Sequence, residues 1–153
     1  MKKFELTSEF VTFLGKKLFR IKALISFGNV KEGELGGFVE KEENLSDYGN
    51  AWVSGDARVF GNAWVFGNAW VSGDAWVSGD ADYATVQGFG SEYRTTTFFR
   101  TKAGDIGVRC GCFYGTLDDF RKKVKETHGD SKTAKEYLMV ADLMEFRFSK
   151  EEV

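Results

Sequence analysis

The chain has 153 residues, a net charge of −2 at pH 7, 18 glycines, no proline and an aromatic content of 16%. This length suits one medium-sized domain or two small ones, and a charge so close to zero excludes recruitment of long nucleic acids or anionic membranes by a bulk electrostatic field. The sequence shows no apolar run of membrane-spanning length and no signal-peptide pattern at its start, and two cysteines do not make a disulfide framework, so we expect a cytoplasmic protein with reduced thiols.

Two strands are expected near the start of the chain. The first covers residues 10–14 and the second residues 18–25, where apolar and polar side chains alternate as they do in a half-buried strand. Several glycine-containing turns should follow the second strand. We therefore interpret residues 1–48 as an N-terminal strand cap and a lead-in to the next segment.

Residues 49–84 consist of six consecutive hexapeptides that begin with Gly-Asn or Gly-Asp and share the pattern G-[ND]-A-x-V-x. The Ala and Val positions are two residues apart, so in an extended strand they face the same way, while Gly and Asn or Asp accept the corner between strands. Three hexapeptides, or 18 residues, close one triangular coil with Ala and Val inside. The period predicts a short left-handed parallel β-helix of two coils, in which residues 18 apart stack at about 4.8 Å.

The hexapeptide period ends after residue 84, and residues 85–153 are expected to form an α+β module. Residues 95–100 and 106–113 have strand patterns. Thr116 is a good helix N-cap with Asp119 in capping-box spacing, Gly129 should end this helix, and a second helix should begin near Ser131. The predicted fold is therefore mainly β, with a hexapeptide-repeat β-helix between a strand cap and an α+β C-terminal module.

Parts of the sequence resemble a known group of proteins. The hexapeptides resemble those of the hexapeptide-repeat superfamily, whose enzymes are trimeric acyltransferases. Segments 20–24, 27–40 and 43–46 look like the corresponding part of phage and prophage hexapeptide-repeat proteins, which are labelled acyltransferase or polymer-forming protein. Segments 111–120 and 125–130 resemble C-terminal modules of small phage-encoded proteins.

The acyltransferase activity that this resemblance implies requires a histidine near the coil as general base. The repeat contains no histidine, and His128 lies outside it, at the expected end of a helix. We therefore predict no catalytic residue, no metal and no cofactor, and keep a degenerate acyltransferase as an alternative.

The outward positions of the repeat carry unusually large side chains. The 18-residue period places Trp52 beside Trp70, Arg58 beside Trp76 as a cation–π pair, and Trp64 beside Asp82. Aromatic and Arg side chains of this kind are typical of interfaces. The predicted ligand- or partner-binding residues, including two at the corners, are Trp52, Arg58, Phe60, Trp64, Phe66, Trp70 and Trp76.

Two explanations of these faces remain open. Another copy of the chain, in a dimer or trimer, or the chain's own terminal segments could cover them. Alternatively they form a surface for a host protein or a ligand, and indoles beside Arg58 could hold the base of a small nucleotide.

The C-terminal module contains further candidate residues. Cys110 and Cys112 are interpreted as small buried hydrophobic residues. A metal site would need more ligands than His128 and carboxylates offer, and a Cys–His nucleophile requires His128 to fold back onto the cysteine strand. The basic run 121–125 fits a solvated helix face, with an acidic partner as the alternative.

Three functional hypotheses follow. The leading one is a non-catalytic oligomeric binding protein. The resemblance implies a phage-encoded inhibitor of a bacterial defence system, which binds a host protein or sequesters a nucleotide signal in the host cytosol. The alternatives are an enzyme, either a degenerate acyltransferase or a Cys–His enzyme, and a structural, polymer-forming or virion-associated protein.

Overall fold

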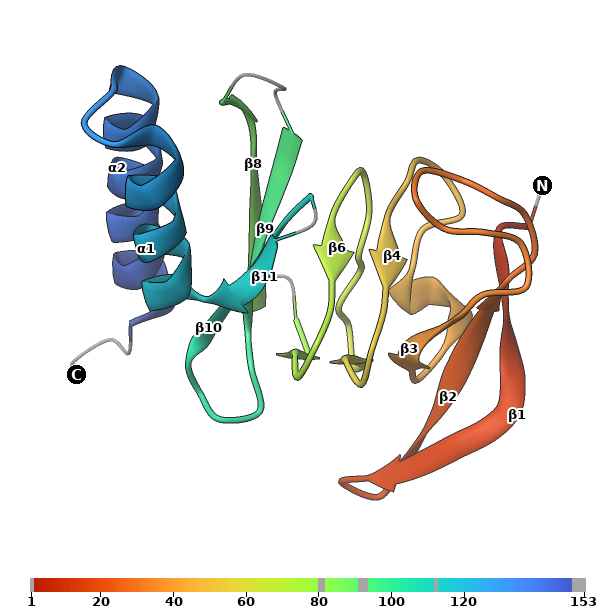
Figure 1. Ribbon diagram of the computed structural model, residues 1–153. Coiled ribbons are helices and arrows are strands. Elements are labelled where there is room, and N and C mark those ends of the chain that lie inside the picture. Colours follow the sequence, from red (N-terminus) through yellow and green to blue (C-terminus); the bar gives the residue numbers. More distant parts are fainter. Residues whose placement is uncertain (1, 80–81, 91–93, 112, 150–153) are drawn as a thin grey trace.

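The computed structural model describes residues 2–79, 82–90, 94–111 and 113–149. A long β-hairpin lies at one end of the molecule, short strands of the hexapeptide segment lie in the middle, and two helices lie at the other end (Figure 1). In the described part of the chain, no helix combines the length and the apolar character needed to cross a membrane.

The N-terminal hairpin is longer than the sequence indicated. Strands β1 (Phe4–Phe13) and β2 (Lys16–Ala23) are antiparallel, and Leu14 and Gly15 turn between them with φ values of 53° and 77°. Strand β3 (Leu35–Val39) pairs antiparallel with β2 and parallel with β5, and the 3-10 turn η1 (Glu42–Asn44) follows. The hairpin therefore extends the edge of a sheet that continues into the hexapeptide segment.

In its described residues, the hexapeptide segment forms four strands of two residues each, β4 (Trp52–Val53), β5 (Arg58–Val59), β6 (Trp70–Val71) and β7 (Trp76–Val77). β4 pairs parallel with β6 and β5 with β7, both in the expected 18-residue register, and a parallel bridge joins Leu45 to Val65. The inward positions are at most 2% exposed, as expected for Ala51, Val53, Ala57, Val59, Ala63, Val65, Ala69, Val71, Ala75 and Val77.

The predicted fold class is nevertheless wrong, and so is the identification as a phage-type hexapeptide-repeat protein. The sheets are a mixed five-stranded sheet in the order β1-β2-β3-β5-β7, an antiparallel four-stranded sheet and the pair β4-β6, not one left-handed parallel β-helix. The strands outside the hexapeptides pair antiparallel with one another. At the C-terminal end of the hexapeptide segment, Tyr83 stands where the pattern has Val, and it begins strand β8, which pairs antiparallel with β9. The hexapeptide period therefore determines which hexapeptide strands pair with each other, but not whether the sheets as a whole are parallel, antiparallel or mixed.

The C-terminal part consists of an antiparallel sheet with two helices packed on it. The sheet has the order β11-β10-β9-β8, and its strands are β8 (Tyr83–Phe89), β9 (Arg94–Arg100), β10 (Ile106–Cys110) and β11 (Phe113–Thr116). The helices α1 (Leu117–His128) and α2 (Lys132–Phe148) lie together at the end of the molecule (Figure 1). The expected helix boundaries are confirmed: Thr116 and Asp119 form a capping box, Ser131 caps α2 and Gly129 ends α1.

β9 closes the C-terminal end of the hexapeptide segment. The N–H of Trp70 donates to Oγ1 of Thr97 at 3.0 Å, and the N–H of Lys102 donates to the carbonyl of Asp74 at 2.8 Å. Phe99, on the same strand, is fully buried in the core that the Ala and Val residues form. The hexapeptide core therefore continues into the C-terminal sheet through Phe99 and these two hydrogen bonds.

A buried lysine satisfies a backbone group at the other end of the hexapeptide core. Where β4 pairs with β6, the N–H of Trp52 donates to the carbonyl of Ala69. The carbonyl of Ala51 is in the equivalent position one period earlier, where no preceding hexapeptide strand supplies an N–H donor. Nζ of Lys3 donates to that carbonyl at 2.6 Å, and the residue is only 1% exposed. Burial lowers the pKa of Lys3 to about 8, and the nearby carboxylate of Asp47 raises it in part.

Two further side chains perform the same role at the next corner. Nδ2 of Asn44, which is fully buried, donates to the carbonyls of Ala63 and Gly61 at 2.8 and 3.3 Å. The N–H of Gly61 donates to Oε1 of Glu40 at 2.8 Å, and this hydrogen bond lowers the pKa of Glu40 below its ordinary value. Because an unpaired buried backbone group is costly, these contacts explain why the hexapeptides need the segment before them.

Candidate functional site

The structure places Trp52 in the core and not on a binding surface. The residue is fully buried, and the ring of Phe27 packs against it at 5.4 Å with an interplanar angle of 73°. Its indole N–H has no hydrogen-bond partner among the described residues. The chain's own N-terminal part therefore covers this Trp, which is one of the two explanations left open by the sequence.

Trp70, its neighbour in the ladder, is half-buried beneath an arginine of the C-terminal sheet. The guanidinium carbon of Arg109 lies 4.0 Å from the ring centroid, a cation–π geometry. The indole N–H donates to Oγ of Ser54 at 2.8 Å. Trp70 therefore joins the middle of the molecule to its C-terminal part.

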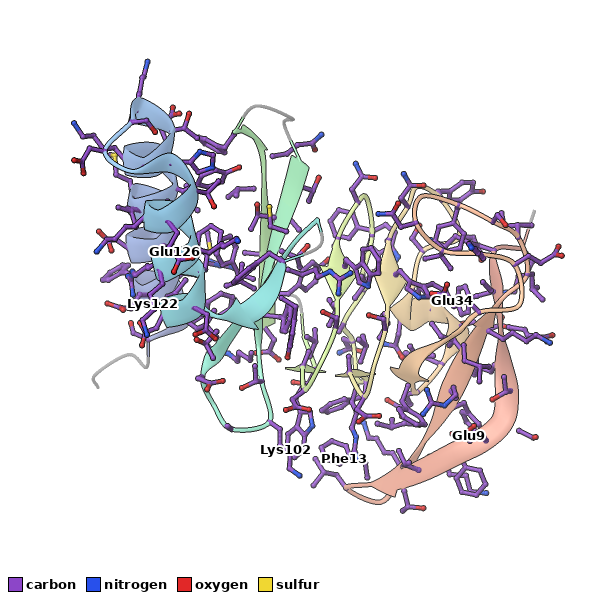
Figure 2. All side chains as sticks on the ribbon, in the orientation of Figure 1. Glu9, Phe13, Glu34, Lys102, Lys122 and Glu126 are labelled. Carbon is purple, nitrogen blue, oxygen red and sulfur yellow. The ribbon has the colours of Figure 1, made fainter. Side chains whose placement is uncertain are left out.

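The predicted pair of Arg58 and Trp76 is confirmed and lies beneath the tip of the β1–β2 hairpin. The guanidinium carbon of Arg58 is 5.9 Å from the Trp76 ring and 4.9 Å from the ring of Phe13. Phe13 also contacts Trp76 and Phe60 edge-on, at 4.6 and 5.1 Å. Figure 2 labels Phe13 and Lys102 on this edge of the molecule.

A groove of about 300 Å³ lies beside this pair. Its charged lining residues are Arg58 and Lys102, with Asp56 and Asp74 against them. Two cations and two carboxylates leave the groove without net charge. The groove therefore offers less attraction to an anionic ligand than Arg58 alone suggests.

Trp64 and Phe66 are the predicted binding residues that remain most exposed. Both are 48% exposed, and their rings stack at 4.6 Å with an angle of 26°. Asp82, which the hexapeptide period places beside Trp64, forms an ion pair with Arg100 at 3.0 Å. A shallow hollow next to Trp64 includes Tyr48, which is 82% exposed. Its charged lining residues are Glu42, Glu43 and Asp47 together with Lys2, which forms ion pairs with Glu42 at 3.2 Å and with Asp47 at 3.8 Å.

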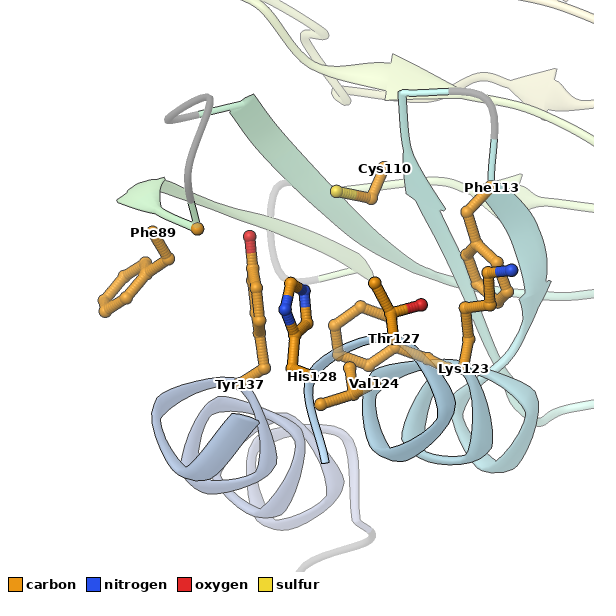
Figure 3. Close-up of a pocket in the computed structure, with 10 residues that line it drawn as sticks. Phe89, Cys110, Phe113, Lys123, Val124, Thr127, His128 and Tyr137 are labelled. Atoms are coloured by element: carbon orange, nitrogen blue, oxygen red, sulfur yellow. The ribbon is translucent and has the colours of Figure 1, made fainter. Parts of the chain in front are cut away.

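The C-terminal part contains a pocket of about 270 Å³, which lies between the sheet and the two helices (Figure 3). The aromatic rings of Phe89 in β8, Phe113 in β11, Phe120 in α1 and Tyr137 in α2 form much of its wall. The described lining residues are Phe89, Gly90, Cys110, Phe113, Phe120, Lys123, Val124, Thr127, His128 and Tyr137.

The aromatic walls hold one another in place. The Phe120 ring meets that of Tyr137 at 5.7 Å and 89°, and that of Phe113 at 6.0 Å. The His128 ring stacks on Tyr137 at 6.0 Å and 28°, and Figure 3 shows these two rings side by side. Such edge and stacked contacts fix ring orientations, so the pocket has a defined shape.

The polar lining of this pocket comes mainly from α1. Lys123 and Thr127 are one helical turn apart on the same side of the helix, and His128 ends it. No carboxylate belongs to the described lining. The pocket therefore combines apolar walls with an ammonium group, a hydroxyl and an imidazole at its α1 side.

Cys110 and His128 line the same pocket, as the Cys–His hypothesis requires, but they are not paired. The Cys110 sulfur accepts a hydrogen bond from Oγ1 of Thr96 at 3.2 Å, and no hydrogen bond within the described residues joins it to His128. Cys112 lies outside the described residues. Within the described chain, no three His, Cys, Asp or Glu side chains are grouped to hold a metal. The described residues therefore do not form the hydrogen-bonded thiol–imidazole pair that a Cys–His nucleophile requires.

Sequence reasoning treated the residues of this pocket separately and missed the site. Lys123 belonged to the basic run assigned to a solvated helix face, and Phe120 to a core stripe. The available signal was the aromatic content of β8, β11 and α2 near a lysine and a histidine of α1. Only the packing of α1 and α2 on the sheet brings these residues together.

Comparison with known proteins adds no assignment. No protein-family model matches the chain, and no curated protein matches its sequence.

Proposed function

We propose that the protein is a non-catalytic binding protein that holds a small planar anion in the aromatic pocket of its C-terminal part. The observation that supports this proposal most strongly is the composition of the pocket. It has aromatic walls and a lysine and histidine at one side, without a carboxylate among its described lining residues. Ligand sites are typically apolar concavities with a few polar groups that fix orientation.

The aromatic walls favour a flat ring as the body of the ligand. Phe113, Phe120 and Tyr137 present ring faces and edges against which a planar ring can stack or pack edge-on. The volume of about 270 Å³ is slightly below the range of about 300–1,000 Å³ typical of sites for drug-sized ligands. This size favours a ligand no larger than a mononucleotide.

Lys123 and His128 favour an anionic group on that ring. The Lys123 ammonium makes no ion pair with any described residue, so a phosphate or carboxylate would not need to displace a protein carboxylate. Thr127 adds a hydroxyl that can donate to the same group. A nucleoside monophosphate has both the ring and the charge, so the proposal keeps sequestration of a small nucleotide as the function.

The exposed aromatic residues supply a second candidate function, which is binding of a basic protein segment. Tyr48 and Trp64, which stacks on Phe66, line one hollow with Glu43 and with Glu42, which also forms an ion pair with Lys2. Exposed aromatic groups beside carboxylates suit Lys- or Arg-rich partners.

Isothermal titration calorimetry with adenosine 5′-monophosphate, adenosine and inorganic phosphate tests the pocket proposal. We expect the monophosphate to bind most tightly, since only it uses both the rings and the cation. Lys123→Ala should weaken its binding by about tenfold, or about 1.4 kcal/mol. Lys122→Ala is the matched control, because Lys122 is an exposed neighbour on α1 outside the pocket lining.

Two results would contradict the proposal. Equal affinity for adenosine and its monophosphate would exclude a role for the cationic side of the pocket. Equal losses in the Lys123 and Lys122 variants would place the anion on the general basic surface of α1.

A further inference from the structure

Helix α2 presents an apolar stripe that no described part of the chain covers. Met139, Leu143 and Phe146 are 71%, 56% and 78% exposed, and their spacing of four and three residues places them on one side of the helix. The opposite side packs on α1 and the sheet through buried residues, among them Tyr137, Val140, Ala141, Met144 and Phe148. Because α2 lies at the end of the molecule, this stripe is accessible to a partner (Figure 1).

We infer that this stripe joins two copies of the chain, with their α2 helices antiparallel across a two-fold axis. Large contiguous apolar side chains on a surface typically mark an interaction site. In a two-fold interface the same patch meets itself and must be complementary to itself. The charged residues on the edges of the stripe are arranged so that the patch is complementary to a second copy of itself.

Glu136 and Arg147 lie on the same edge of the stripe. They are 11 residues apart, close to three turns of about 3.6 residues, so they project from one side of the helix. Glu136 is half-buried and Arg147 exposed, and neither forms an ion pair with a described residue. Within one chain they are about 16 Å apart along the helix, too far to pair with each other.

One two-fold axis aligns both the apolar and the charged residues. An axis midway between Met139 and Leu143 places Met139 against the partner's Leu143. Such an axis places each edge of the stripe beside the same edge on the partner helix. Along the helix axis, Glu136 then lies within one residue, about 1.5 Å, of the level of the partner's Arg147. The interface would contain two such Glu–Arg pairs.

The other edge of the stripe does not oppose this arrangement. Asp142 lies there and would approach the partner's Asp142 near the axis. Each Asp142 carboxylate already binds the guanidinium of Arg121 at 2.9 Å, and Arg121 also binds Glu145 at 3.0 Å. These ion pairs reduce the repulsion between the two carboxylates.

Three apolar side chains per copy make a small interface, and interfaces below about 1,200 Å² usually belong to weak complexes. The dimer should therefore form with a dissociation constant in the micromolar range. This surface is separate from the aromatic pocket, so the inference is independent of the proposed function.

Sedimentation equilibrium across micromolar protein concentrations tests the dimer. We expect the wild-type chain to show a reversible monomer–dimer equilibrium and Leu143→Glu to remain monomeric, with unchanged helix content by circular dichroism. Leu14→Asn is the matched control, because Leu14 is 76% exposed and its φ of 53° suits asparagine. This control should dimerise like the wild type.

A charge exchange tests the proposed register. Glu136→Arg and Arg147→Glu should each weaken dimerisation by about tenfold or more because each places like charges together, and the double variant should restore it. A monomeric wild type at all concentrations, or dimerisation that Trp64→Ala abolishes and Leu143→Glu leaves intact, would overturn the inference. So would a double variant that associates no better than the single ones.

Discussion

Lys3 should make the stability of the fold rise with pH above neutrality. Its ammonium is buried with Nζ on the carbonyl of Ala51, and burial lowers its pKa from 10.5 to about 8. In the unfolded chain the group keeps its ordinary pKa. The folded protein therefore loses this proton at a lower pH than the unfolded chain does.

The size of the effect follows from the two pKa values. Between about pH 8 and 10.5 the unfolded chain binds more protons, so the free energy of unfolding increases with pH in this window and loses this contribution as pH falls through 8. Relative to pH 7, Lys3 alone should add about 1.4 kcal/mol at pH 9 and about 2.5 kcal/mol at pH 10. Below pH 7 it should add nothing further.

Urea denaturation of the wild type and Lys3→Met at pH 7, 9 and 10 measures this contribution. Other groups that titrate in this range are common to both proteins, so they cancel in the difference between the two stabilities. That difference should grow by about 2.5 kcal/mol in favour of the wild type between pH 7 and 10. Lys2→Met, which changes an exposed lysine, should run parallel to the wild type. If the free energy of unfolding of Lys3→Met also changed with pH in parallel with that of the wild type, the ammonium of Lys3 would not be desolvated in the folded protein.

Four further substitutions test how the fold is stabilised, each by urea denaturation. Asn44→Ala should lower the free energy of unfolding by about 2–4 kcal/mol, because it removes the donor to the buried carbonyl of Ala63 and to the partly buried carbonyl of Gly61; a loss under 1 kcal/mol would mean that water replaces the amide. Trp52→Ala should cost about 3–5 kcal/mol and Trp64→Ala under about 1 kcal/mol, and equal losses would contradict the burial of Trp52. Thr116→Ala should cost about 1 kcal/mol by removing the cap on Asp119 N–H, and an unchanged stability would show that α1 does not depend on it.

The parts of the fold that sequence predicted correctly are those governed by local rules. Alternating Ala and Val gave the inward side of the hexapeptides, and the 18-residue register of Trp52 and Arg58 with their ladder partners followed from the period. Thr116 and Gly129 marked the ends of α1 because caps depend on a few neighbouring residues. These features need no information about distant parts of the chain.

The sheet class and the site could not be predicted in the same way, since both depend on contacts between distant segments. The period carried no information about the hairpin, whose Phe13 covers the Trp76 face, or about Phe27, which covers Trp52. The pocket likewise exists only because α1 and α2 pack on the sheet and bring His128 beside Tyr137. Residue types alone made the outward indoles the most prominent candidates, although the structure uses most of them for internal packing.

An NMR titration with adenosine 5′-monophosphate distinguishes binding in the C-terminal pocket from binding on the hexapeptide faces, because the indole N–H signals report on those faces separately from the pocket. We expect backbone amide shifts to concentrate at Lys123, Thr127, His128 and the residues around Tyr137, while the indole signals of Trp70 and Trp76 stay in place. Shifts confined to these indoles would move the binding site to the hexapeptide faces, and a spectrum without any shift at millimolar ligand would contradict the proposal that this pocket binds a planar anion.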